Sequence, residues 1–309
     1  MTKKNAVSVN QLTKIYAKKS TNPVVALNEL NLEVKEGEIF GLLGPNGAGK
    51  TTFINILSGT VIKTKGNVNV WGFDIDKNQR QVRASVGIVP QEVNLDAFFS
   101  PRKLLELQAG LYGVPKKNRI TDTILKMVSL EKQAKSYSRS LSGGMKRRLL
   151  IAKAMVHQPP ILVLDEPTAG VDVELRQNLW ENVKSLNKQG VTIILTTHYL
   201  FEAQEMSDRI AILNKGNLVA LDTTKNLLNK IKAKKIIFKV NKLIDLSKKK
   251  VNGLSFSSNL NNDIIVTYER NRHKIEDIIN IIKSEGVEIV DITTKDGNLE
   301  DVFIQLTKN

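Results

Sequence analysis

The stretch from residue 44 to 52 constrains the fold of this chain most strongly, because it reads Gly-Pro-Asn-Gly-Ala-Gly-Lys-Thr-Thr. It matches every fixed position of the phosphate-binding template G-x-x-x-x-G-K-[ST]. Glycines let the backbone wrap closely around a phosphate, where successive N–H groups form an anion-binding nest. Residues 39–43 are apolar and predict a buried strand, and residues 52–57 predict the helix that follows. Strand, loop and helix in this order are the context that the template requires.

A second candidate phosphate cradle lies at residues 141–145, which read Leu-Ser-Gly-Gly-Met and precede a stretch with helical spacing at 145–152. A serine and two glycines ahead of a helix leave backbone N–H groups free at the positive end of the helix dipole. One nucleotide needs only one cradle. We therefore interpret the second cradle as serving a nucleotide that another molecule holds, which makes the working protein a dimer.

Two adjacent carboxylates, Asp165 and Glu166, follow the apolar run at 161–164. A carboxylate at the tip of a buried strand can hold Mg²⁺, and the next side chain can face the terminal phosphate and polarise an attacking water. An acidic turn that merely caps a strand is the alternative for such a pair on its own. In the phosphate loop, Lys50 is expected to reach the β- and γ-phosphates, and the Thr51 hydroxyl is expected to ligate Mg²⁺.

Four further side chains are candidates by position alone. Gln91 follows Pro90 where the predicted sheet joins a helical stretch, and its amide can touch Mg²⁺ or the attacking water. His198 follows the predicted strand 193–197 and can bind the γ-phosphate. Tyr16 can stack on adenine, and Asp172 is expected near a dimer seam. Three of them have plainer alternatives: an ordinary loop glutamine for Gln91, a structural histidine for His198, and a core or surface aromatic residue for Tyr16.

Composition excludes several classes of protein. The chain has 309 residues, 41% of them hydrophobic, which suffices for a sizeable core in one large domain or two. It has no cysteine, which excludes disulfides, cysteine-ligated zinc and thiol catalysis. No apolar run approaches the 18 residues of a membrane span, and the first residues lack the apolar segment of a secretory signal, which predicts a cytosolic location.

The net charge of +15 has two interpretations. It could reflect an anionic partner, such as nucleic acid or an acidic membrane surface. Lysine, asparagine and isoleucine are abundant throughout, however, and the basic residues are not gathered into one motif interleaved with aromatic residues. A compositional bias with solvated lysines is the plainer explanation, also for the lysine-rich stretch at 225–250.

The order of patterns predicts two domains. Residues 1–223 carry every chemical motif and include a mainly helical insertion at about 94–157, flanked by strands. Residues 209–220 predict a hairpin with a Lys-Gly-Asn turn. Residues 224–309 predict a small α+β domain, with strands at 236–240, 264–268 and 287–292 and helices at 274–284 and 299–306.

Taken together and in this order, the motifs resemble those of ATP-binding-cassette ATPases, the nucleotide-binding subunits of ABC transporters. The resemblance covers about residues 6–222, with 141–145 at the position of the family's signature motif. It implies an α/β fold with a P-loop NTPase (RecA-like) core, an antiparallel β subdomain and an inserted helical subdomain. It also implies two copies that bind head to tail, each ATP lying between the phosphate loop of one copy and the signature of the other.

The resemblance assigns roles to individual residues. It implies contacts with ATP for Tyr16, Gly44, Pro45, Asn46, Gly47, Ala48, Gly49, Lys50, Thr51, Thr52, Gln91, Ser142, Gly143, Gly144 and Asp172. It implies catalytic roles for Glu166, His198 and Lys50. It implies Mg²⁺ ligation by Thr51, Gln91 and Asp165.

Two stretches resemble a narrower group, the ATPase subunits of ABC-2-type exporters. These are residues 298–303, which read Asn-Leu-Glu-Asp-Val-Phe, and residues 108–114 of the helical stretch. This resemblance implies a homodimer on the inner face of the cell membrane, held there by a separate integral membrane permease that docks near Gln91. Met145 departs from the glutamine usual at the end of the signature, and residues 170–172 depart from common family sequences. Neither change removes a phosphate-contacting serine or glycine.

Two other functions are compatible with parts of this pattern. A soluble ABC ATPase acting on ribosomes or nucleic acid would suit the basic charge, but such proteins usually carry two cassettes, zinc modules or long coiled-coil insertions, and we expect no nucleic-acid partner. A nucleotide-sensing module without catalysis would lack the glutamate or the histidine, and both are present. The sequence does not indicate the transported substrate, and it leaves the role of the C-terminal domain open.

Overall fold

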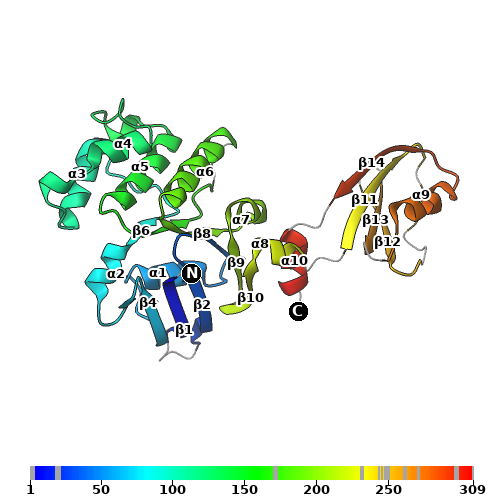
Figure 1. Ribbon diagram of the computed structural model, residues 1–309, viewed down its shortest axis with the longest axis horizontal. Coiled ribbons are helices and arrows are strands. Elements are labelled where there is room, and N and C mark those ends of the chain that lie inside the picture. The colour runs from blue at the N-terminus through cyan, green and yellow to red at the C-terminus, as the bar shows by residue number, and fades with distance from the viewer. Residues whose placement is uncertain are drawn as a thin grey trace. The chain divides into compact units, whose positions relative to one another are not determined.

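The computed structural model describes residues 4–17, 22–169, 173–229, 233–242, 244, 246, 251–259, 263–269, 272–295 and 299–307. They belong to two compact units, Met1–Thr223 and Thr224–Asn309 (Figure 1). No helix in the described ranges has the length and apolar character that crossing a membrane would need.

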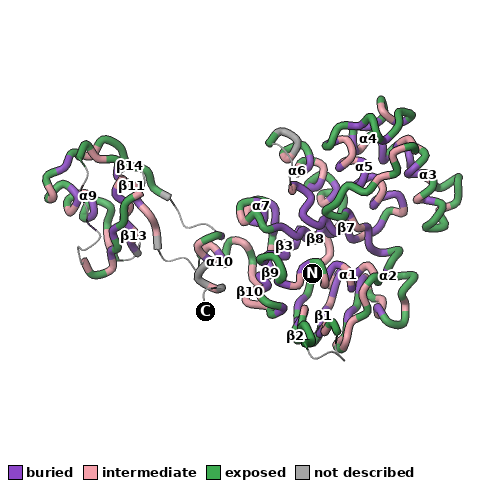
Figure 2. Tube along the Cα trace, turned by 180° about the vertical axis from the view of Figure 1, so that it is seen from behind, coloured by how far each residue is buried: buried purple, intermediate pink, exposed green. Residues whose placement is uncertain are grey.

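A six-stranded sheet forms the centre of the first unit. Its order is β10 (Asn217–Thr223), β9 (Arg209–Asn214), β3 (Ile39–Leu43), β8 (Thr192–Thr197), β7 (Ile161–Asp165) and β6 (Val86–Val89). All pairs are parallel except the hairpin β9–β10. Every residue of β3, β7 and β8 is buried, as Figure 2 shows. Such continuous apolar strands are typical of a parallel sheet that is covered on both faces.

The two faces of this sheet belong to different hydrophobic clusters. Phe40 and Val163 pack with α1 (Lys50–Leu57) and the antiparallel strands, whereas Leu162 and Leu195 pack with α5 (Gly143–Met155) and α6 (Val173–Lys188). The second sheet has the order β2 (Val24–Lys35), β1 (Asn5–Tyr16), β4 (Lys65–Val70) and β5 (Phe73–Asp74). Two short helices complete the core, α2 (Gln79–Ser85) and α7 (Leu200–Met206).

The helical insertion forms a lobe with a core of its own. It contains α3 (Pro101–Leu111), α4 (Thr121–Met127) and the first part of α5, with two single 3-10 turns at Lys116–Asn118 and Ser138–Ser140. Leu105, Ile124 and Leu149 lie at its centre and are almost fully buried. In Figure 1 this lobe lies on the opposite side of the parallel sheet from β1, β2 and β4.

The second unit is an α+β domain. A four-stranded antiparallel sheet has the order β12 (Leu254–Ser258), β13 (Ile264–Glu269), β11 (Ala233–Val240) and β14 (Ile289–Lys295). Ile236, Phe238 and Val266 pack with Ile278 and Ile282 of α9 (Ile275–Lys283). The unit also contains α8 (Thr224–Asn229) and α10 (Leu299–Thr307).

The structure differs from the pattern-based expectations mainly at irregular strands. Strand β1 runs for 12 residues, but its sequence alternates strictly between apolar and polar residues only over residues 7–10. Its pairing shifts register after Val9, and Gln11 has a φ of 50°. A bulge of this kind breaks the period of two on which a strand prediction depends. Helices α2, α6, α7 and α8 and strand β12 are also present without having been predicted.

Candidate functional site

The phosphate loop is held between two strands from different sheets. A Cβ on Gly44 would lie 2.5 Å from the carbonyl oxygen of Leu213 in β9, and one on Gly49 would lie 2.5 Å from the carbonyl oxygen of Ala26 in β2. Gly49 also has a φ of 106°, which L-residues rarely adopt. Helix α1 begins directly after it and has no side-chain cap, so its first N–H groups point into the loop.

Lys50 is the first residue of α1, and its side chain is buried inside the loop. Its ammonium donates to the carbonyl oxygens of Gly44 at 2.7 Å and Pro45 at 3.3 Å. Burial lowers the pKa of Lys50, and the nearby carboxylates of Glu166 and Asp165 oppose this shift. A desolvated cation next to free backbone donors is suited to binding the terminal phosphates of a nucleotide.

Asp165 is the last residue of β7 and lies in the sheet interior. The hydroxyl of Thr196, on the neighbouring strand β8, donates to Asp165 Oδ1 at 2.5 Å. Burial raises the pKa of the Asp165 carboxyl, and the negative charge of Glu166 adds to that effect, while Thr196 and Lys50 oppose it. The fold therefore holds a carboxylate at the strand tip at an electrostatic cost, which is typical of functional sites.

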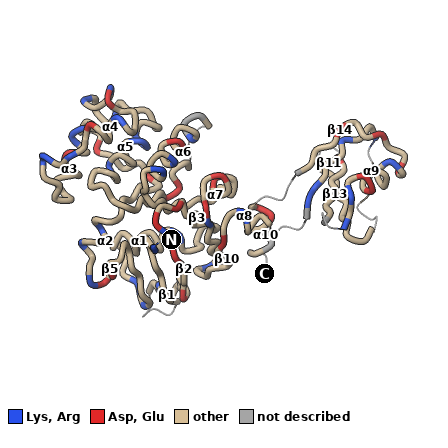
Figure 3. Tube along the Cα trace, in the orientation of Figure 1, with Lys and Arg blue, Asp and Glu red and all other residues tan. Residues whose placement is uncertain are grey.

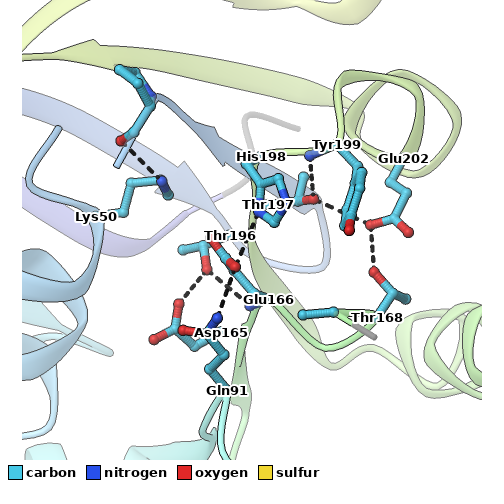
Figure 4. Close-up of polar contacts among 12 residues, drawn as sticks. Lys50, Gln91, Asp165, Glu166, Thr168, Thr196, Thr197, His198, Tyr199 and Glu202 are labelled. Atoms are coloured by element: carbon cyan, nitrogen blue, oxygen red, sulfur yellow. Dashed lines mark hydrogen bonds and ion pairs between the residues drawn. The ribbon is translucent and has the colours of Figure 1, made fainter. Parts of the chain in front are cut away.

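The side chain of Glu166 contacts two other candidate site residues, Gln91 and His198. Its Oε2 accepts from Gln91 Nε2 at 3.0 Å and lies 3.1 Å from His198 Nδ1, as Figure 4 shows. The backbone of Glu166 is left-handed, with a φ of 45°, and its N–H donates to the carbonyl oxygen of Thr196 at 3.1 Å. Non-glycine residues in this conformation are uncommon and cluster at functional sites. Three segments that are distant in sequence thus meet at one carboxylate.

A cleft of about 610 Å³ adjoins these residues. It is lined by the phosphate loop from Asn46 to Thr52, by the side chains that meet at Glu166, and by the strand ends at Tyr16, Val24 and Val25. The Tyr16 hydroxyl lies 3.5 Å from that of Thr52 at the rim. Tyr16 is 37% exposed, and the ammonium of Lys14 lies over its ring at 4.7 Å from the ring centre. An apolar rim beside a phosphate-binding loop fits a nucleoside triphosphate.

The second predicted cradle lies on the helical lobe, at the beginning of α5. Ser142 is the N-cap, and its hydroxyl accepts from the backbone N–H of Met145 at 3.3 Å. Ser142 and Gly143 are exposed, and a Cβ on Gly143 would meet no atom within 4 Å. None of the residues that line the nucleotide cleft comes from 141–145, although that whole segment is described. Asp172, the other candidate for a dimer seam, lies outside the described residues.

Comparisons with known proteins assign the family. Residues 27–169 match the model of the family described as ABC transporter. The linearmycin resistance ATP-binding protein LnrL of Bacillus subtilis is 37% identical over 234 residues, which are 75% of this chain and 73% of that protein. The chain belongs to the ABC transporter ATP-binding proteins. This confirms the predicted resemblance, and as a member of this family the chain binds and hydrolyses ATP.

Further relatives of this ABC ATPase are exporter subunits and solved cassettes. A Nod factor export ATP-binding protein I of Cupriavidus pinatubonensis is 32% identical over 292 residues, or 94% of this chain and 88% of that protein. The cassette MJ0796, solved as a dimer in a post-hydrolysis state with ADP and Pi, has a TM-score of 0.62 at 28% identity, covering 71% of this chain and 98% of its own. This solved cassette confirms the predicted fold class.

Several residues of this ABC ATPase lie at the site without a signal in the sequence. The hydroxyl of Thr196 donates to the carboxylate of Asp165 and accepts from the backbone N–H of Glu166. Glu202 of α7 is 2% exposed and accepts from the hydroxyls of Thr168 at 2.7 Å and Thr197 at 3.2 Å, as Figure 4 shows. It thereby connects the segments after Glu166 and before His198. A buried glutamate on a short helix looks like an ordinary solvent-facing residue until the tertiary contacts are known.

The basic residues of the chain do not gather at the site. Figure 3 shows lysine and arginine on both units, interspersed with acidic residues. In the described ranges there is also no group of three or more histidine, aspartate or glutamate side chains arranged to hold a metal ion.

Proposed function

We propose that this chain is the ATPase subunit of an ABC-2-type exporter and that it works through ATP-dependent closure of a homodimer. In the closed dimer, each ATP lies between the phosphate loop of one copy and Ser142, Gly143 and Gly144 of the other. The observation that carries the proposal is the separation of two phosphate cradles within one copy. The nucleotide cleft is lined without any signature residue, and Ser142 and Gly143 of the signature are exposed at the start of a helix.

The names of the relatives support the export role. LnrL confers linearmycin resistance by name, and the Nod factor relatives are named for export. The dimeric form of the cassette MJ0796 supports the closed dimer. We infer from the same relatives that the chain lies at the inner face of the cell membrane and is held there by a separate permease.

We propose that Mg²⁺ accompanies ATP. The predicted ligands are the Thr51 hydroxyl, the Asp165 carboxylate and the Gln91 amide oxygen, and hard oxygen donors of this kind suit Mg²⁺. Because Gln91 donates through Nε2 to Glu166, its Oε1 is the atom left for another partner. When bound, Mg²⁺ would neutralise part of the phosphate charge. The small number of carboxylates fits an ion that takes its remaining ligands from phosphate and water.

Glu166 is our candidate for the group that orients the attacking water. Both of its side-chain contacts, with Gln91 and His198, use Oε2. Its Oε1 is therefore the oxygen available to accept a proton from water. Gln91 and His198 fix the direction of the carboxylate, and a fixed carboxylate within reach of water is what general-base assistance requires.

The test of the composite site is the Glu166→Gln variant. An amide keeps the size of the side chain but removes the proton acceptor, so ATP should bind and persist. We expect this variant to elute as a dimer on size exclusion with Mg²⁺ and ATP, and as a monomer with ADP. The parent chain should hydrolyse ATP and return to the monomer. A monomeric variant that still hydrolyses ATP at the parental rate would contradict the shared site.

We place the permease on a groove between the helical lobe and the core. The groove has a volume of about 430 Å³, and its lining includes Pro90, Gln108, Tyr112 and the basic side chains of Arg83 and Lys153. Next to it, α3 exposes Leu111 to 75%. Leu107, one turn earlier on the same helix, is 50% exposed, and neighbouring exposed apolar residues of this kind mark protein contacts. Pro90 precedes Gln91, so a segment docked here would lie close to the residue that contacts Glu166.

The docking site is tested with Leu111→Glu. We expect this variant to lose co-purification with the co-expressed permease while the ATPase activity of the isolated subunit stays within about twofold of the parent. The matched control is Ile62→Glu, which alters a residue that is 80% exposed on the β subdomain. If both variants retain the permease, the groove is not the docking site. Recovery of the parent chain with ribosomes or DNA instead of a membrane protein would overturn the exporter assignment.

A further inference from the structure

A buried arginine, Arg147, lies in the second turn of α5 and is only 8% exposed. One guanidinium nitrogen, Nη1, donates to the carbonyl oxygens of Gln91 at 2.5 Å and Pro90 at 3.5 Å. The other, Nη2, donates to the carbonyl oxygen of Ala169 at 3.3 Å. One side chain of the helical lobe thus contacts two separate loops of the core.

The contacts of Arg147 are unusual for a buried charge. No carboxylate of the described residues forms an ion pair with it, and burial lowers the pKa of its guanidinium. A buried cation held only by backbone dipoles is costly, because carbonyl groups compensate less than a carboxylate does. Carbonyl acceptors, however, fix the path of the backbone itself. The arginine therefore specifies where the two loops lie, independently of their side chains.

Both loops also bind the catalytic candidate Glu166. Gln91 reaches its Oε2 through the side-chain amide, and the backbone N–H of Ala169 donates to its carbonyl oxygen at 3.2 Å. Arg147 therefore bridges the two segments that hold Glu166 on either side. Any movement of Gln91 toward or away from Glu166 must either carry Arg147 with it or break a contact of 2.5 Å.

The same arginine belongs to the helix that starts with the signature. Ser142 is the N-cap of α5, and Arg147 follows five residues later on the same rigid element. We propose that Arg147 is a positioning residue. Within one copy, it fixes the position of the signature relative to Gln91 and Glu166 of that same copy. The inference rests on the proposed composite site, because it explains how the two halves of each copy stay aligned before the copies meet.

The fork of the guanidinium is essential to this role. Its two terminal nitrogens point to different loops at once, and a lysine has only one nitrogen, which cannot span both. The next residue, Arg148, provides a matched control. It donates through Nη1 to the carbonyl oxygens of Val128 at 2.9 Å and Ser129 at 3.2 Å. Its partners are backbone carbonyls as well, but they lie within the helical lobe and not in the core.

The experiment compares Arg147→Lys and Arg147→Gln with Arg148→Lys in the full chain. We expect both Arg147 variants to bind ATP within about twofold of the parent, because the phosphate loop is unchanged. Turnover should fall roughly tenfold or more in kcat with little change in KM, which indicates loss of an interaction after binding. In a Glu166→Gln background, ATP-driven dimerisation should weaken by a similar factor. Arg148→Lys should keep kcat and dimerisation within about twofold of the parent.

The outcomes separate this inference from the proposed function. If Glu166→Gln itself fails to dimerise with ATP, the composite site and the role of Arg147 are both wrong. If it dimerises and Arg147→Lys dimerises and turns over equally well, only the role of Arg147 is overturned. Equal losses in Arg147→Lys and Arg148→Lys would likewise overturn it, because the effect would then come from lobe packing in general.

A distance measurement between two spin labels tests the positioning role of Arg147 without relying on turnover. The chain has no cysteine, so spin labels can be placed at two introduced cysteines alone. Lys132→Cys on the helical lobe and Asn67→Cys on the β subdomain are both exposed positions outside the site. We expect Arg147→Lys to broaden the label-to-label distance distribution both with and without ATP. An unchanged distribution would overturn the inference.

Discussion

At the scale of single residues, the site depends on charges that the fold holds at a cost. Asp165 lies in the sheet interior, where burial raises the pKa of its carboxyl. Arg147 and Lys50 are cations whose pKa values burial lowers. Buried charges of this kind lower the free energy of unfolding of the free chain. Interactions with a bound ligand or with a neighbouring loop offset the cost of their desolvation.

Asp165→Asn should therefore stabilise the nucleotide-free chain while impairing hydrolysis. The asparagine keeps an acceptor for the Thr196 hydroxyl and removes a buried negative charge. We expect the melting temperature of the free chain to rise by a few degrees, measured by thermal denaturation. Mg²⁺-dependent ATP hydrolysis should fall by roughly a hundredfold or more. A lower melting temperature than that of the parent would show that the carboxylate is compensated in the free chain.

His157 gives the chain a pH dependence away from the site. Its ring stacks on Tyr112 with centroids 3.7 Å apart, and burial lowers its pKa to about 4. In the unfolded chain a histidine titrates near its ordinary pKa of about 6.5. The unfolded state therefore binds the proton first, and stability is lost as the pH falls from 6.5 through about 4.

The matched variant for this effect is His157→Phe, which keeps an aromatic ring against Tyr112 and removes the titration. Denaturant unfolding of the parent at a series of pH values should show a decreasing midpoint below pH 6.5. The variant should lack the part of that decrease that His157 contributes. Parallel curves for parent and variant would mean that the pKa of His157 is the same in the folded and the unfolded chain.

Sequence patterns predicted the motif residues of the site but not the residues that hold them. Gln91, Glu166 and His198 were predicted separately, and the structure brings them within hydrogen-bond distance. Their assigned roles stay predictions. Arg147 and Glu202 were not predicted, because a charged residue in a helical stretch gives no signal of burial. Their burial depends on contacts with loops that are distant in sequence.

At the scale of elements, α5 has different tasks on successive turns. Its first turn presents Ser142 and Gly143 to solvent, and its second turn carries Arg147 into the core. Its apolar residues are split between the lobe core and the sheet core, as Leu149 and Leu150 show. The helix therefore lacks one continuous apolar stripe. The spacing predicted a helix at 145–152, and α5 extends beyond that range at both ends.

The exposed first turn of α5 can be tested with Ser142→Arg. The variant loses an N-cap, which costs about 1 kcal/mol, and it fills the space in front of the helix. We expect ATP binding by one copy to stay within about twofold and turnover to become undetectable, measured by calorimetric titration and phosphate release. The control, Ser140→Arg, adds the same charge two residues earlier at an exposed position and should keep at least half of the turnover. Full activity of Ser142→Arg would exclude the signature from the nucleotide site.

Elements were predictable where their periodicity is regular. Strands β3, β7 and β8 are continuous apolar runs that are buried on both faces, and they appear within one residue of the predicted ranges. Strand β12 was missed because it alternates leucine and phenylalanine with serine over only five residues, Leu254–Ser258. So short an alternation is common in loops as well.

At the scale of the whole molecule, each of the two units encloses its own hydrophobic core. Residues 1–223 contain the clusters around the parallel sheet and in the helical lobe, and residues 224–309 contain the cluster around Phe238 and Val266. The sequence predicts a first domain at 1–223 and a second at 224–309, because the motifs stop where the composition changes. We propose that the second unit is an accessory domain to the ATPase unit.

Two separate cores predict two thermal transitions in calorimetry. Mg²⁺ and ATP should raise only the transition of the first unit, since a ligand stabilises the part that binds it. Phe238→Ala should lower only the other transition, on the order of 10 °C or more, because Phe238 is fully buried. If one cooperative transition responds to both ATP and Phe238→Ala, the two units are not independent in stability.

The close packing of the phosphate-loop glycines against two strands has a consequence for genetics. A side chain on Gly44 or Gly49 would collide with the backbone of Leu213 or Ala26, so alanine alleles at these positions should impair folding itself and lower the abundance of the subunit. Lys50→Ala or Glu166→Gln alleles should instead yield a folded but inactive subunit. Such a subunit would still compete for partner copies and for the permease. The first class of alleles is therefore expected to be recessive in a cell that also carries the parental gene, and the second class dominant.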